Sequence, residues 1–114
     1  MSTESVVNHH LSSVGAADVD AIMEDFTEES VILMPEGPLR GLEAIRGLMT
    51  TLVTEMVPPG SDFNMINMSI EGEVGYIVWS ASSEKFDSPI GTDTFIVKND
   101  KIMVQTFAAK MDPK

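Results

Sequence analysis

The apolar residues of this chain change their spacing once, at Pro58-Pro59-Gly60, and this change constrains the fold more than any other feature. Before that point, apart from one strand-like run at residues 30–34, they recur every three or four residues, which is the spacing of one face of a helix. From Asp62 on, runs rich in β-branched and apolar residues alternate with short turns, a pattern typical of strands. Helices followed by antiparallel strands predict an α+β domain with its helices on one face of the sheet.

The first predicted helix covers residues 3–14. Its apolar positions fall at i, i+3, i+4 and i+7, and they are Val7, His10, Leu11 and Val14. This spacing turns His10 toward the core, whereas His9 falls on the side that faces solvent.

Two more helices and one strand are predicted before the sheet. Asp18 is a plausible N-cap for a short second helix, and a strand-like run at residues 30–34 stops at Pro35. The third helix opens at Gly41 and ends before residue 58, because proline cannot continue a helix.

The second half of the chain predicts a meander of four strands. They span residues 64–70, 74–82, 92–98 and 101–110. Turns are expected at residues 71–73 and at Asn99-Asp100. The sequence has no repeat, linker or low-complexity stretch, so we expect residues 1–114 to form a single domain.

The charge of the chain excludes several classes of partner. Eighteen acidic residues against seven basic ones give a net charge of −11. Such a surface repels phosphate backbones and anionic lipids, so we expect neither nucleic acid nor membrane as a partner. The polar, acidic start lacks the pattern of a signal peptide, and no apolar run approaches the ~18 residues of a membrane span, so we expect a cytoplasmic protein.

Six acidic residues cluster ahead of the first predicted strand. They are Asp18, Asp20, Glu24, Asp25, Glu28 and Glu29. A metal site is one interpretation, but no nearby histidine or alternating Asp/Asn loop completes a coordination sphere. A solvated helix face followed by a turn is the favoured interpretation.

Both faces of the predicted sheet are apolar. Residues 76–79 are apolar without a break, and residues 102–104 repeat this pattern. An antiparallel sheet that is apolar on both sides needs a second cover. A second copy of the same sheet is the simplest cover, so we predict a homodimer through the back of the sheet.

Three segments of the chain resemble the nuclear transport factor 2-like superfamily. They are residues 18–31, the block from Pro35 to Arg46, and the ending from Gly91 to Phe107, which looks like SnoaL-like bacterial proteins. This superfamily includes ketosteroid isomerase and SnoaL-like polyketide cyclases. The resemblance implies one such domain over residues 1–114, with three N-terminal helices on the concave face of a cone-shaped, curved antiparallel sheet. It specifies the fold but not the function, because the fold hosts isomerases, cyclases, dehydratases, hydrolases and non-catalytic binders.

Ketosteroid isomerase allows a comparison residue by residue. The resemblance places Asp93 where that enzyme has a protonated oxyanion-hole aspartate, and His10 where it has a tyrosine. The position of its aspartate base is occupied by Met34. A thioether cannot accept a proton at pH 7, so steroid isomerisation by that mechanism is not expected.

His10 and Asp93 are therefore the predicted catalytic pair, on opposite walls of one pocket. If they meet, the carboxylate orients the imidazole and favours its charged form. The alternative for His10 is a satisfied core residue. An inward carboxyl at Asp93 must find a partner or stay neutral.

Five further residues are predicted to bind the ligand. Strand alternation puts Phe95 on the face of Asp93, and the resemblance turns Gln105 and Phe107 inward. Met34 and Trp79 complete the set, although Trp79 fits either the pocket or the dimer seam. The nine methionines suit an adaptable apolar cavity as well as a core.

Three functions remain open from the sequence. The first is an isomerase, cyclase or dehydratase that acts on a small apolar or carbonyl-bearing molecule through His10 and Asp93. The second is a non-catalytic binder with the same pocket, and the third is a dimeric interaction module without one. Metal, phosphate-loop and nucleophile-triad motifs are absent from the sequence, so we expect no cofactor.

Overall fold

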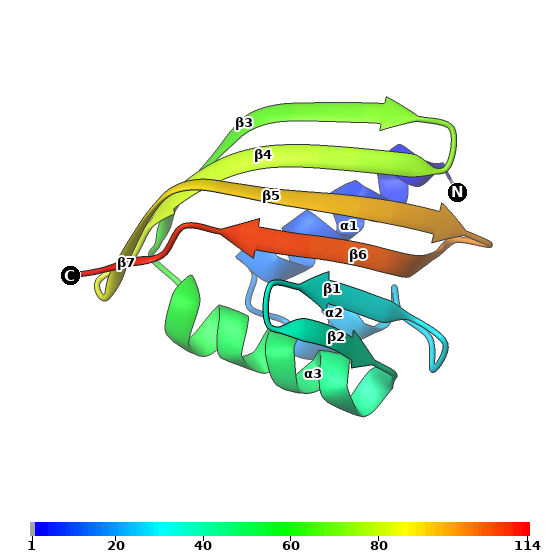
Figure 1. The fold of residues 1–114 in the computed structure, drawn as a ribbon, viewed down its shortest axis with the longest axis horizontal. Helices are drawn as coiled ribbons and strands as arrows, with labels where there is room; N and C mark the ends of the chain where they lie inside the picture. The colour runs from blue at the N-terminus through cyan, green and yellow to red at the C-terminus, as the bar shows by residue number, and fades with distance from the viewer. Residues whose placement is uncertain (1) are drawn as a thin grey trace.

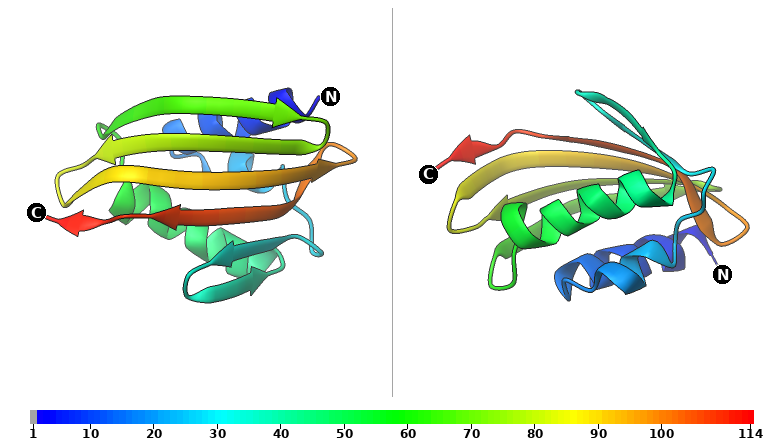
Figure 2. Two further views of the ribbon diagram at one scale, coloured as in Figure 1. Left: turned by 45° about the horizontal axis from the view of Figure 1, so that its top comes forward. Right: turned by 90° about the horizontal axis from the view of Figure 1, so that it is seen from below.

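A curved, unclosed sheet bends over three helices in the computed structural model, which describes residues 2–114 (Figures 1 and 2). The strand order is β2-β1-β6-β5-β4-β3, with β7 beside β5. The strands are β1 Val31–Met34, β2 Gly37–Arg40, β3 Asp62–Glu71, β4 Val74–Ser82, β5 Phe86–Lys98, β6 Lys101–Ala109 and β7 Asp112–Pro113. All neighbours are antiparallel except β1 and β6, which are parallel. The predicted α+β class and curved sheet are confirmed.

The helices lie on the concave face, as the right view of Figure 2 shows. They are α1 Thr3–Gly15, α2 Val19–Met23 and α3 Leu42–Thr51, and α3 continues into the π-helical turn η1 Leu52–Met56. Asp18 caps α2 as predicted, because its Oδ1 accepts from the backbone N–H of Ala21 at 3.0 Å. None of the helices in residues 2–114 is long and apolar enough to cross a membrane.

The sheet contains more strands than the sequence predicted, and some of them are longer. The segment after Pro35, to which the sequence assigned no strand, forms β2 and pairs with β1 from Met34↔Gly37 to Val31↔Arg40. Gly37 adopts a φ of 126°, which residues with a side chain rarely reach, and this allows the tight reversal. Strand β5 begins at Phe86 rather than at residue 92, because a register shift in β4 between Trp79 and Ala81 lets the pairing continue.

The interpretation of the acidic cluster as a solvated helix face and turn is wrong for Asp25, which is buried. It is only 5% exposed, and its Oδ2 lies 2.6 Å from Nδ1 of His9 on α1. Its backbone carbonyl accepts from the N–H of Ile102 at 2.7 Å, which fixes the loop after α2 against the start of β6. His9 keeps part of its predicted exposure, because 38% of its side chain reaches solvent. The contact between His9 and Asp25 joins residues that are far apart in the chain, and no local pattern in the sequence indicates it.

Replacing His9 by glutamine is expected to remove a pH-dependent part of the stability. The hydrogen bond to Asp25 raises the pKa of His9, so the folded chain binds the imidazole proton more tightly than the unfolded chain. This stabilisation is complete below the ordinary pKa of 6.5 and is lost as the pH rises through the raised value. Because solvent screens the pair, we expect at most about 1 kcal/mol.

Urea unfolding of both proteins at pH 6 and pH 8 measures this effect. The difference in unfolding free energy between the unmodified chain and His9→Gln is expected to be larger at pH 6. An equal difference at both pH values would contradict the pH-dependent contact.

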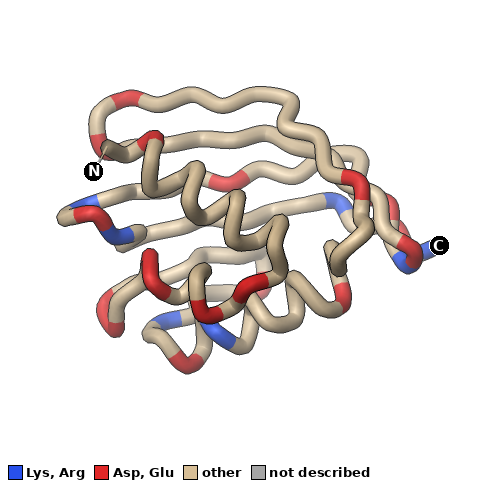
Figure 3. Tube along the Cα trace, turned by 180° about the vertical axis from the view of Figure 1, so that it is seen from behind, with Lys and Arg blue, Asp and Glu red and all other residues tan. Residues whose placement is uncertain are grey.

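Alternation resolves the apolar run of β4 into two faces. Ile77 and Trp79 point into the concave side, whereas Tyr76 and Val78 point to the side without helices. The neighbours of this outer face on β5 are uncharged, because Tyr76 pairs with Thr94 and Val78 with Thr92. Figure 3 shows charged residues mainly on the helices, turns and strand ends. The convex face around Tyr76 and Val78 is thus a mixed apolar and threonine surface.

Candidate functional site

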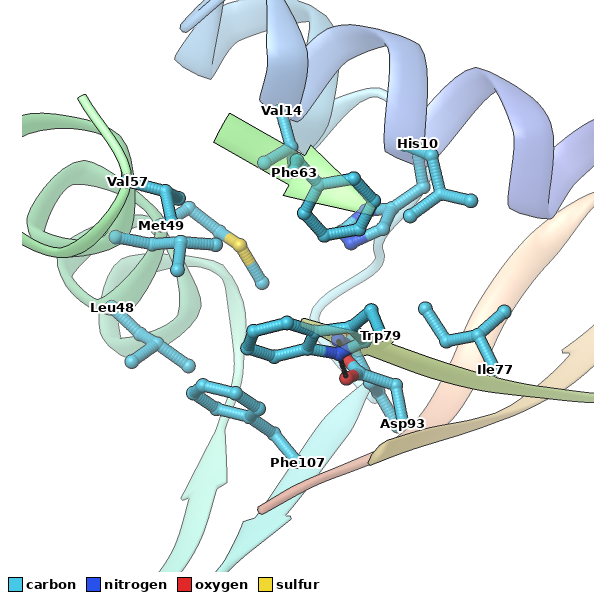
Figure 4. Close-up of a pocket in the computed structure, with 13 residues that line it drawn as sticks. His10, Val14, Leu48, Met49, Val57, Phe63, Ile77, Trp79, Asp93 and Phe107 are labelled. Carbon is cyan, nitrogen blue, oxygen red and sulfur yellow. Dashed lines mark hydrogen bonds between the residues drawn. The ribbon is translucent and has the colours of Figure 1, made fainter. Parts of the chain in front are cut away.

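A cavity of about 60 Å³ lies between α1, the end of α3 and the concave face of the sheet (Figure 4). A space of ~10–15 Å³ is enough for one water molecule, so this cavity has room for a few small groups. Apolar side chains form most of the wall, for example Leu11 from α1 and Met49 from α3. Three buried polar side chains interrupt it, and they are His10, Asp93 and Gln105.

Asp93 reaches the cavity from the middle of β5 and is 7% exposed. Its Oδ1 accepts from Nε1 of Trp79, and its Oδ2 accepts from Nε2 of Gln105, both at 2.8 Å. Burial raises the pKa of Asp93 to about 6, although these two hydrogen bonds favour the charged form and oppose the shift. The carboxyl group is therefore mostly ionised at pH 7, and it gains a proton as the pH falls through about 6.

His10 reaches the cavity from α1 and is 3% exposed. Its ring packs edge-on against Phe26 and Phe95, with centroid distances of 5.9 and 5.3 Å. Burial lowers the pKa of His10 to about 4, and the positive charge of His9 adds to this effect. The imidazole is therefore neutral at pH 7, and its Nδ1 has no hydrogen-bond partner among residues 2–114.

No hydrogen bond joins His10 to Asp93 within the described chain, because the recorded partners of the carboxylate are Trp79 and Gln105. Figure 4 shows the imidazole and the carboxylate on different walls of the cavity. The charged imidazole expected from direct contact is accordingly not formed, and the pKa of His10 moves downward instead.

The indole of Trp79 lies on the concave side because Gly91 faces it across β4 and β5. A Cβ atom at Gly91 would be only 2.2 Å from Cζ2 of Trp79. The glycine thus leaves the space that the indole fills, and this position directs Nε1 to Asp93. The indole also stacks with Phe63 and Phe107, at centroid distances of 5.7 and 6.3 Å.

The remaining predicted ligand contacts fall in three places. Gln105 and Phe107 line the same cavity as Trp79. Phe95 is fully buried behind His10 and supports its ring. Met34 lies outside this cavity, in a neighbouring groove next to Pro35.

Sequence reasoning did not assign several residues that line the cavity. Leu48 and Met49 of α3 and Phe63 of β3 contribute to the wall. Met49 lies in the predicted third helix, but helical spacing does not distinguish a core residue from a cavity residue. Phe63 had no signal, because the strand was predicted to begin one residue later.

Solved structures of other proteins share the fold of this chain. A search of curated protein sequences finds no match. Among solved structures, an NTF2-like protein of unknown function from Mesorhizobium loti is 20% identical with a TM-score of 0.78, over 95% of this chain and 90% of that one. A proposed polyketide cyclase from Sinorhizobium meliloti is 17% identical with a TM-score of 0.75, over 91% and 94%. A proposed ketosteroid isomerase from Kribbella flavida is 8% identical with a TM-score of 0.78, over 98% and 80%.

The TM-scores of 0.75 to 0.78 establish a shared fold, whereas identities of 20% or less leave the chemistry to the residues of the site. A family model described as the SnoaL-like domain matches residues 7–105. The match includes His10, Asp93 and Gln105, the three polar groups of the cavity. The chain therefore belongs to the SnoaL-like domain family.

Proposed function

We propose that this protein binds a small, mainly apolar carbonyl compound in the cavity and moves a proton on it, with Asp93 as the acid–base group. One observation carries the proposal. A buried carboxyl with a pKa of about 6 lies in the same apolar cavity as a neutral imidazole with an unpartnered nitrogen. Strongly perturbed groups that share a cavity are candidates for a functional site.

The two groups suit different parts of one reaction. A carboxylate with a pKa near the working pH accepts a proton efficiently and returns it. Asp93 would remove a proton from the carbon next to the carbonyl of the ligand. His10, neutral at pH 7, would donate its N–H to the carbonyl oxygen and stabilise the developing negative charge. In this scheme Asp93 replaces the base that Met34 cannot provide.

Exchange of hydrogen for deuterium tests the proposal without a known product. Small cyclic and linear ketones are incubated with the protein in D₂O, and loss of the signal of the hydrogens next to the carbonyl is followed by NMR. The exchange rate is expected to rise with pH through about 6, as Asp93 loses its proton, and then to level off. Exchange no faster than in buffer would contradict the proton transfer.

A non-catalytic binder is the second candidate, and the hydrogen bonds of Asp93 favour it. Both carboxylate oxygens already accept an N–H, which is also what a purely structural buried carboxylate requires. Thermal stabilisation by a ketone without any deuterium exchange would select this candidate.

We also propose that the chain forms a homodimer through the convex face. In a chain with a net charge of −11, an uncharged face such as that around Tyr76 and Thr94 is where two copies repel least. Tyr76, 40% exposed, offers an aromatic anchor of the kind that is common in interfaces.

The substitution Thr94→Glu is expected to convert this dimer to a monomer in sedimentation experiments. It would place two like charges in the centre of the interface, which costs several kcal/mol. Thr50→Glu on the exposed side of α3 is the matched control and is expected to leave the dimer intact. A monomeric unmodified chain, or a dimer that persists with Glu at position 94, would contradict the proposal.

A further inference from the structure

A second hollow lies next to the cavity, with a volume of about 180 Å³. Three methionine and two alanine side chains contribute to its wall, and we call it the methionine groove. These side chains include Met34 from the end of β1, Met56 from η1 and Met111 from the chain after β6, with Ala109 from β6. Glu36, in the turn between β1 and β2, lies at its edge and is exposed.

The cavity and the methionine groove share two side chains, Leu48 and Phe107, and each of these lines both hollows. The partition is therefore a single layer of side chains. Both residues are partly buried rather than fully packed, and Figure 4 shows them on the same side of the cavity. Rotation of single side chains is fast, so a partition of this kind can open without movement of the backbone.

We infer that the cavity and the methionine groove form one binding site for an elongated ligand, with its carbonyl head beside Asp93 and its apolar tail in the groove. This inference rests on the proposed function, since the head occupies the same cavity. A space of about 60 Å³ accepts a head group but not a tail, whereas about 180 Å³ is available behind Phe107. Methionine side chains are flexible, so they can adapt to an aliphatic tail that has no fixed shape.

The charge of the chain narrows the class of ligand further. A net charge of −11 and Glu36 at the edge of the groove disfavour a carboxylate or phosphate on the tail. His10 and Gln105 each carry a buried polar atom without a partner among residues 2–114, Nδ1 and Oε1. These atoms suit a head that makes hydrogen bonds. The expected class is a neutral ketone or a related carbonyl compound with an unbranched aliphatic tail.

The only tryptophan of the chain makes this inference testable by fluorescence. Trp79 lines the cavity and stacks on Phe107 at the partition, so its emission reports occupation of the head site. Methyl ketones from pentanone to undecanone are titrated into the unmodified protein. The dissociation constant is expected to fall about fourfold for each added methylene, the effect of burying one CH₂, until the groove is full.

Two lysine variants locate the tail. Met34→Lys introduces a charge into the methionine groove and is expected to abolish the gain with chain length, while the affinity for pentanone stays within about twofold of the unmodified value. Ile66→Lys adds the same charge at an exposed position of β3 that lines neither hollow, and it is expected to retain the full gain.

Each outcome separates the inference from the proposed function. If pentanone binds and longer ketones bind no better, the extended site is wrong while the proposed function stands. If the gain with length survives Met34→Lys, the tail lies elsewhere and the inference is also wrong. If no ketone of any length changes the emission of Trp79, the proposed function fails, and the inference fails with it.

Discussion

Substitution of Asp93 by asparagine is expected to slow deuterium exchange on a bound ketone by about 10²–10⁴-fold, the usual contribution of one acid–base group. Binding is expected to remain, because the variant keeps the shape of the cavity. Trp79 can only donate, so it fixes the amide oxygen of residue 93 at the present position of Oδ1. The amide of Gln105 can then turn over and accept from the new NH₂ group with Oε1, which has no partner now.

The same variant is expected to be more stable than the unmodified chain at neutral pH. Burial raises the pKa of Asp93 from 3.8 to about 6, so the folded state disfavours the charged carboxylate. The unmodified chain therefore loses stability as the pH rises from about 4 through about 6, and asparagine does not. Above pH 7 the gain is on the order of 3 kcal/mol, because the pKa shifts by about two units and each unit corresponds to about 1.4 kcal/mol.

Deuterium exchange and urea unfolding of the same protein samples measure both effects. A variant that is more stable but inactive identifies Asp93 as a functional group that is costly to bury. Full exchange activity in Asp93→Asn would rule out the acid–base role. A loss of stability at pH 8 would instead indicate that Asp93 is a structural carboxylate.

A large loss of stability is expected for the substitution Gly91→Ala. The new methyl group would lie 2.2 to 2.6 Å from three ring atoms of Trp79, so the indole must lift from the sheet. We expect a loss of about 1–3 kcal/mol from overpacking. A further ~1–3 kcal/mol follows if the hydrogen bond from Nε1 to Asp93 breaks and leaves a buried polar group without a partner.

Urea unfolding and the emission maximum of Trp79 measure this effect, because the displaced indole moves toward water. Gly47→Ala in α3 is the control, since a Cβ atom at Gly47 has no neighbour within 4 Å. That change is expected to stabilise the helix by about 0.5–1 kcal/mol. Equal stability and equal emission in Gly91→Ala and the unmodified chain would show that the indole does not rest on Gly91.

Local patterns predicted the framework of the site. The helical spacing turned His10 inward, and the resemblance placed Asp93 on an inner strand, as the structure now has them. The first placement follows from the fixed period of a helix face, whereas the second came from the resemblance and not from spacing. Their roles in catalysis stay predictions until the exchange experiments are done.

Contacts between distant segments could not be predicted in the same way. The run from Tyr76 to Trp79 is apolar throughout, so alternation did not fix which face the indole occupies. The fixing element is Gly91, twelve residues later in the chain, through its register with Trp79. The contact of His9 with Asp25 likewise depends on how a loop packs after α2. The helical spacing predicted the inward direction of His10, but the lowered pKa depends on how completely the other elements bury the imidazole.

The parallel pairing of β1 with β6 has a consequence for biosynthesis. Val31 is next to Val104 and Leu33 next to Thr106, so an early strand finds its neighbour only near the end of the chain. Pairing over such long separations is slow, because the intervening chain must be ordered first. On the ribosome, α1 and the β1–β2 hairpin must wait with their inner surfaces uncovered until β6 has emerged, and the cavity is completed among the last steps, when Gln105 and Phe107 arrive.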